Sequence, residues 1–274
     1  MSLRLGFVHV PKCGGTSVAN AIFAAFGMES FHIAHLRNEN EAWGPHDVIR
    51  HHVSYRLARA VPFLSGHITY SDMQDLGRNM IFTVLRDPYA AALSRYTYNV
   101  GRAHDPKILA RRPHLEPYKH ITLSEHLDTA TPAQFLISLG RDVFSEKEII
   151  NVASKGVTMM DENPIVQKKI DRALRRFDMV LGGGQLSQQM KIFSKFIDAD
   201  EITIEHHNRS KETLPTPLGA SRQVIIEKLV QLCWLDEYVY ARCERFFPET
   251  MLPLVPDAEK TFDAFVKRFQ PSGG

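Results

Sequence analysis

The hydrophobic pattern at the start of the chain changes period once, across a short loop with two adjacent glycines. Before the loop, LRLGFV is an apolar run that stops ahead of Pro11, as a buried strand does. After the loop, apolar residues recur on one helical face and Gly27 follows as a stop signal; they are Val18, Ile22, Phe23 and Phe26. This order of strand, glycine loop and helix predicts an α/β fold.

A second junction of the same kind lies further along the chain. The run NMIFTVLRDP predicts a strand, and Pro88 fits the first turn of a helix that extends to Gly101, while FLSGHITY predicts a neighbouring strand. This alternation predicts one three-layer domain over residues 1–274, with a mainly parallel sheet covered by helices on both faces. Ligands of such sheets bind at the carboxyl ends of the strands, so we expect residues 11–17 and 86–94 to meet in one crevice.

The remaining pattern is mostly helical. Helices are expected over residues 131–140, 145–156, 163–177, 187–197, 221–247 and 258–269. Strands are expected over residues 178–183 and 201–207, and one short helix fits residues 54–61. The stretch 102–120 is basic, contains three prolines and lacks an apolar period, so we interpret it as a mobile surface loop.

Composition limits the partners and the compartment. A formal net charge of +2 is too small a bias to predict nucleic-acid binding, and a hydrophobic share of 44% allows a sizeable core. No apolar stretch approaches the roughly 18 to 20 residues that span a bilayer, and no secretory signal pattern is present. Three scattered cysteines predict neither a disulfide framework nor a zinc site. We therefore expect a soluble, cytoplasmic protein.

Thirteen histidines raise the question of a metal site. They include the adjacent pairs at residues 51–52 and 206–207, but adjacent residues on a strand point to opposite faces. No His-x-x-x-His motif with a nearby glutamate is present. We expect no metal site.

The glycine loop PKCGGTS has the residues of an oxyanion site. Two glycines allow backbone N–H groups to approach an anion, and the following helix directs its positive end to the same point. A Walker A loop would place its lysine after the last glycine, whereas here the lysine comes first. The residues expected to bind phosphate or sulfate are Lys12, Gly14, Gly15, Thr16 and Ser17. The alternative is a plain strand-to-helix turn with Lys12 facing solvent.

At these residues the chain resembles a known family. HVPKCGGTS resembles the 5′-phosphosulfate loop of the sulfotransferases that use 3′-phosphoadenosine 5′-phosphosulfate, especially the carbohydrate branch with its hPKxGGTS pattern. VLRDPYAAALSRYTY resembles the 3′-phosphate motif of that family, which implies that Arg86 and Ser94 bind the 3′-phosphate. LDEYVYARCERFFP is similar to a late helix with aspartate and tyrosine in these enzymes. The resemblance implies the P-loop-like sulfotransferase fold.

The resemblance also implies roles in the reaction. Lys12 would offset charge on the leaving 5′-phosphate oxygen, and no metal would be required. The GH of SGHITY resembles the histidine segment of uronyl 2-O-type enzymes, so His67 is the candidate base; a core histidine is the alternative reading. Other candidates for the base are His9, His32, His35 and a glutamate. Related enzymes supply a late basic segment to the 3′-phosphate or adenine, here Arg209 and Lys211, for which a solvated charge cluster is the alternative.

Two further features have open interpretations. Tyr96 and Tyr98 could pack in the core or against the nucleotide. A set of basic residues could recruit an anionic acceptor or be solvated: Arg102, Lys107, Arg111, Arg112 and Lys119. The resulting prediction is a sulfotransferase acting on a hydroxyl acceptor, first of all a carbohydrate or small metabolite. The alternatives are a nucleoside or small-molecule kinase with a degenerate phosphate loop, and a non-catalytic nucleotide-binding module.

Overall fold

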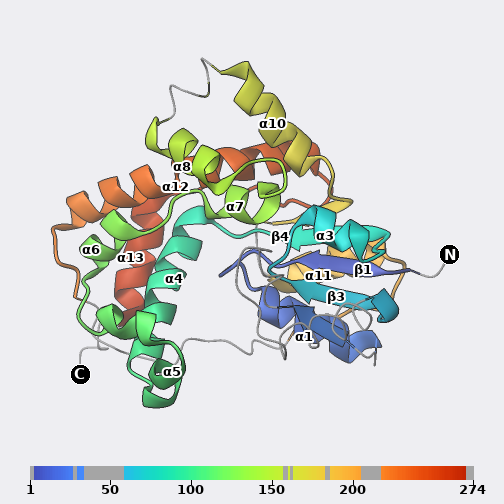
Figure 1. Ribbon diagram of the computed structural model, residues 1–274, viewed down its shortest axis with the longest axis horizontal. Helices are drawn as coiled ribbons and strands as arrows, with labels where there is room; N and C mark the ends of the chain where they lie inside the picture. Colours follow the sequence, from blue (N-terminus) through green and yellow to red (C-terminus); the bar gives the residue numbers. More distant parts are fainter. Residues whose placement is uncertain are drawn as a thin grey trace, which may run out of the picture.

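The protein is built around a parallel sheet with helices on both faces (Figure 1). A computed structural model describes residues 3–26, 30–33, 59–156, 160, 163–182, 186–204 and 217–269. Its strands are β1 (Leu5–Val8), β2 (Ser30–Ile33), β3 (Phe63–Gly66), β4 (Met80–Val84) and β5 (Met179–Leu181). They pair in the order β2-β3-β1-β4-β5, and every pair is parallel. The expected α/β class with a parallel sheet is therefore confirmed.

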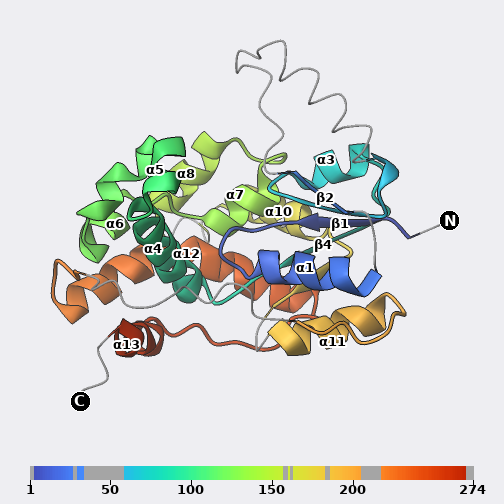
Figure 2. The same ribbon diagram turned by 90° about the horizontal axis from the view of Figure 1, so that it is seen from below.

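Two helices cover one face of the sheet, α1 (Gly15–Phe26) and α11 (Leu186–Phe196) (Figure 2). Phe7 of β1 and Phe82 of β4 stack on this face with ring centroids 4.9 Å apart. Ile22 from α1 and Phe193 from α11 are fully buried against them. Alternate strand residues point to the opposite face, because side chains along a strand alternate between its two sides.

The other face is covered by helices from distant parts of the chain. They are α3 (Tyr70–Asp75), α7 (Gln134–Gly140), α8 (Glu146–Ser154), α10 (Pro164–Leu174) and part of α12 (Arg222–Phe246). The strand residues that they bury include Leu64, Ile81 and Val180. The sheet is thus enclosed on both sides, as a parallel sheet requires.

A helical group lies beyond the carboxyl ends of the strands (Figure 1). It contains α4 (Pro88–Ala103), α6 (Leu123–Thr129), the first half of α12, and α13 (Ala258–Phe269), which share one hydrophobic cluster. Asp87 caps α4 by accepting a 2.7 Å hydrogen bond from the Ala90 amide, and Pro88 occupies the first turn. The predicted α4, α12 and α13 are confirmed.

The expected mobile loop over residues 102–120 is wrong. Residues 102 and 103 end α4, and two helical segments follow, α5 (Pro106–Arg111) and the 3-10 helix η1 (Pro113–Lys119). Pro106 and Pro113 begin these segments, and Pro117 lies inside the 3-10 helix. Asp105 caps α5 by accepting from the amides of Lys107 and Ile108. Leu115, which is buried, anchors η1.

Two other differences concern single segments. No strand forms over residues 201–204, and residues 205–207 of that predicted strand lie outside the described residues. The polar segment between β3 and β4 forms α3 with a capping box, in which Thr69 and Asp72 exchange hydrogen bonds. Most of the helix suggested for residues 54–61 also lies outside the described part. Within that part, no helix combines the length and apolarity that crossing a membrane requires.

Candidate functional site

The strand order creates a switch point between β1 and β4. After β1 the chain continues to β2 and β3, which lie toward one edge of the sheet. After β4 it continues to β5, which lies at the other edge. Connections that diverge in this way leave a crevice at the carboxyl ends of the two strands, where ligands of open α/β sheets bind. The loop before α1 and the segment before α4 both begin there.

A direct contact joins these two segments. The backbone N–H of Arg86 donates a hydrogen bond to the Cys13 sulfur, which is buried. Burial raises the pKa of the Cys13 thiol to about 12, so this cysteine is a packing group and not a nucleophile. The expected convergence of the loop and the Arg86 segment is confirmed.

Backbone conformation explains the first glycine of the loop, and packing explains the second. Gly14 has φ +83°, a left-handed value that favours glycine, and Lys12 has φ +67°. Gly15 has an ordinary φ, but a Cβ atom there would lie less than 3.0 Å from three atoms of the His9 ring. The second glycine is therefore required by the imidazole packed against the start of α1.

The start of α1 supplies backbone donors. Val18 N–H donates to Gly14 O at 3.2 Å. The amides of Gly15, Thr16 and Ser17 come before this bond, in the first turn, where backbone N–H groups have no acceptor within the helix. Thr16 is exposed and Ser17 is buried. Amides at this position, together with the helix dipole, favour an oxyanion.

The side chain of Lys12 points to α4. Its Nζ atom lies 3.7 Å from the centroid of the Tyr98 ring, and the Arg102 guanidinium carbon lies 4.4 Å from the same centroid. Ser94, Tyr98 and Arg102 are spaced four residues apart, so they share one face of α4. The interpretation of Lys12 as a solvent-facing turn residue is wrong.

Positively charged side chains from the loop before α1, from the segment before α4 and from α4 itself come together at this place. Among the described residues, no carboxylate lies within ion-pair distance of four side chains: Lys12, Arg86, Arg95 and Arg102. The pKa of Lys12 is lowered to about 8, first by burial and then by the positive charges of the three arginines. A group of cations of this kind, three of them half-buried, is typical of a site for an anion.

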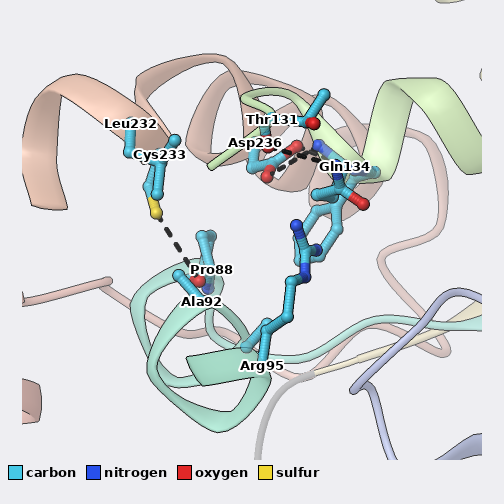
Figure 3. Close-up of a pocket in the computed structure, with 10 residues that line it drawn as sticks. Pro88, Ala92, Arg95, Thr131, Gln134, Leu232, Cys233 and Asp236 are labelled. Atoms are coloured by element: carbon cyan, nitrogen blue, oxygen red, sulfur yellow. Dashed lines mark hydrogen bonds between the residues drawn. The ribbon is translucent and has the colours of Figure 1, made fainter. Parts of the chain in front are cut away.

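Arg95 extends from α4 into a small pocket between α4, α7 and α12 (Figure 3). Asp236 lies across this pocket, but its carboxylate accepts hydrogen bonds from the Phe135 and Gln134 amides, at 2.8 and 3.1 Å. It thus caps α7, whose own N-cap residue Ala133 has no side-chain acceptor. Burial raises the pKa of Asp236 to about 7, and burial also lowers the pKa of Arg95.

His67 follows β3 and lies against His9 of the β1 segment. The His67 Nδ1 atom is 2.7 Å from the His9 carbonyl oxygen, and the two rings stack with centroids 4.4 Å apart. A carbonyl can only accept, so Nδ1 carries a proton, and in the neutral form of the ring Nε2 is the acceptor. That is the tautomer a general base requires.

No known family model matches the chain, and no curated protein matches it.

The other predicted site residues are placed as follows. Arg86 is exposed just after β4, and Ser94 is half-buried on α4. Arg209, Lys211 and His35 lie outside the described residues, and His32 is placed only as a backbone position in β2. Tyr96 is a core residue whose hydroxyl donates to the Ile121 carbonyl at 3.0 Å, whereas Tyr98 is 40% exposed.

The four cations Lys12, Arg86, Arg95 and Arg102 form what we call the cationic group. The sequence pattern gives no role to Arg95 and places Arg102 in a surface loop. The helical spacing of residues 95, 98 and 102 contains the signal, because it places them along one side of α4. The other basic residues of the predicted loop lie on α5, on η1 or between them and are exposed or half-buried, and Lys119 pairs with Glu116 at 3.0 Å.

Proposed function

We propose that the protein is a sulfotransferase that moves a sulfuryl group from 3′-phosphoadenosine 5′-phosphosulfate to a hydroxyl acceptor. The observation that carries this proposal is the group of four cations at the switch point, Lys12, Arg86, Arg95 and Arg102, none of which has a carboxylate partner in the described part of the chain. The donor is an anion at both its 3′ and 5′ ends, so it complements this group. The parallel sheet and the two motifs at its carboxyl edge support a P-loop-like sulfotransferase fold.

The two motifs divide the donor between them. The first-turn amides of α1 and Lys12 would hold the 5′-phosphosulfate, and Arg86 with Ser94 would hold the 3′-phosphate. Arg209 would join the 3′-phosphate side, as the resemblance of its segment implies. The arginine fork is suited to two phosphate oxygens at once, which a lysine is not.

In the reaction, the acceptor oxygen attacks sulfur while the bond from sulfur to the 5′-phosphate oxygen breaks. Charge then grows on the leaving oxygen, and the Lys12 ammonium offsets it. The acceptor proton would pass to Nε2 of His67, because the hydrogen bond from Nδ1 to His9 O makes Nε2 the accepting nitrogen of the neutral ring. A carbohydrate or carbohydrate-bearing metabolite is the acceptor we propose first.

Calorimetric titration with adenosine 3′,5′-bisphosphate tests the donor site. We expect metal-independent binding that weakens about tenfold to a hundredfold in Lys12→Ala and in Arg86→Ala, because each removes a charge-assisted hydrogen bond. Arg111→Ala, which removes an exposed charge on α5, is the matched control and should bind as the wild type does. A preference for ATP with magnesium would favour the kinase alternative, and binding of neither nucleotide would end the proposal.

The His67→Ala variant separates the enzyme from a non-catalytic nucleotide-binding module. We expect unchanged affinity for the bisphosphate and a loss of about a hundredfold to ten-thousandfold in sulfuryl transfer from radiolabelled donor to a panel of saccharides. His114→Ala, at an exposed position on η1, should leave transfer unchanged. A wild-type protein that binds the bisphosphate but transfers nothing to the panel, or to other hydroxyl acceptors, would favour the module.

A further inference from the structure

Tyr98 lies where the proposed donor site would otherwise contain only repelling charges. The centroid of its ring lies 3.7 Å from the Lys12 ammonium and 4.4 Å from the Arg102 guanidinium carbon. The negative face of an aromatic ring attracts a cation, so one ring offsets part of the repulsion between two. Neither cation has a carboxylate partner among the described residues.

The backbone directs Lys12 to this ring. With φ +67°, Lys12 leaves the direction of β1, and the following residues turn into α1. Tyr98 lies one helical turn beyond Ser94 on the same face of α4. The Lys12 ammonium is therefore beside the face that carries the proposed 3′-phosphate ligand.

We infer that Tyr98 is a positioning residue for Lys12. The Tyr98 ring holds the Lys12 ammonium beside the phosphate loop until the 5′-phosphate of the donor replaces the ring as the partner of the ammonium. This inference rests on the proposed function for the identity of the anion. Arg102 is the second cation that contacts the Tyr98 ring, and its role is to bind the same ring. The charged and titratable groups that act on Lys12 are Arg86, Arg95 and Arg102 across from the loop and Cys13 beside it.

The inference predicts opposite effects of two substitutions on the protonation of Lys12. Tyr98→Leu removes a group that stabilises the charged ammonium, so the Lys12 pKa should fall from its value of about 8. Arg102→Leu removes a like charge, so it should rise. Tyr98→Phe keeps the ring face and should behave as the wild type, which a role for the tyrosine hydroxyl would not allow.

The measurement is competitive acetylation of the ligand-free protein with acetic anhydride across a pH series, read by peptide mass spectrometry. The exposed Lys147 on α8 serves as the reference amine in each sample. We expect the labelling midpoint of Lys12 to move down by about half a pH unit to one unit in Tyr98→Leu. Because Tyr98 is 40% exposed, the variant should keep its fold, which circular dichroism verifies. An unchanged or higher midpoint in Tyr98→Leu, or equal shifts in Tyr98→Leu and Tyr98→Phe, would overturn the inference.

A second arm repeats the labelling with saturating adenosine 3′,5′-bisphosphate. We expect at least tenfold slower acetylation of Lys12 in the wild type and in Tyr98→Leu, since the 5′-phosphate then covers the ammonium. If the bisphosphate protects Lys12 but Tyr98→Leu does not shift its labelling midpoint, the donor site is supported and the role of the ring is rejected. If Tyr98→Leu shifts the midpoint but the bisphosphate does not protect Lys12, the ring contact is supported. The donor is then rejected, and with it the exchange of partners that we infer.

Discussion

Gly15→Ala should lower the free energy of unfolding by about 3 kcal/mol, the upper range for overpacking a well-filled core. The added methyl group would lie less than 3.0 Å from three atoms of the His9 ring. That ring is 8% exposed and stacks on Phe7 at 5.5 Å and on His67 at 4.4 Å, so it has little room to move away. Urea denaturation followed by circular dichroism measures the loss.

Gly101→Ala is the matched control with the opposite sign. Gly101 lies in the last turns of α4, and a Cβ atom there meets nothing within 4 Å. Replacement of an exposed helical glycine stabilises by about 0.5 to 1 kcal/mol, because alanine has the higher helix propensity. If Gly15→Ala unfolded at the same urea concentration as the wild type, the close packing of His9 on α1 would be wrong.

The same contact shows what the sequence could and could not reveal at the loop. The glycine pair was predicted to let backbone N–H groups approach an anion, whereas the structure shows at Gly14 a left-handed φ that itself favours glycine. At Gly15 the approaching group is the ring of His9, six residues earlier in the chain. Only the folded arrangement of β1, the loop and α1 brings the ring there, so no local pattern indicates it.

Hydrophobic periodicity was a good guide to the elements that bound the site. β1, α1, β4 and α4 were all predicted, because each has a strong period and a clear stop or start signal. The stretch from residue 104 to residue 120 was misinterpreted, since short helices with caps and prolines have too few turns to show a period. That misinterpretation also hid the fact that Arg102 belongs to α4.

Long-range contacts explain why the full cationic group could not be predicted. Asp236 is 141 residues away from Arg95 in the chain. Its carboxylate accepts hydrogen bonds from the first amides of α7 instead of forming an ion pair with Arg95. From the sequence alone, the ordinary expectation is that basic residues form ion pairs with acidic residues of the same chain or face solvent. Among the described residues, it is the packing of α4, α7 and α12 that places Arg95 beside Asp236 without an ion pair between them.

The affinity for adenosine 3′,5′-bisphosphate should fall about tenfold for each pH unit above 8. The sign follows from Lys12, whose pKa is lowered to about 8 in the free protein, mainly by burial and then by Arg86. Below that pH the ammonium is present to bind the anion, and as the pH rises through 8 the free protein loses it. The phosphate groups do not change charge in this range, because their second pKa is about 6.

Calorimetry from pH 7 to pH 10 on the wild type and on Lys12→Arg measures this slope. Arginine keeps its charge throughout, so the variant should bind with an affinity that does not fall with pH, although its fork fits the loop less well. The Cys13 thiol cannot produce the slope, because its pKa of about 12 lies above the range. An equal fall in Lys12→Arg would assign the titration to another group and would remove Lys12 from the anion site, whereas a flat profile in the variant alone identifies its ammonium as the charge that binds the 5′-phosphate.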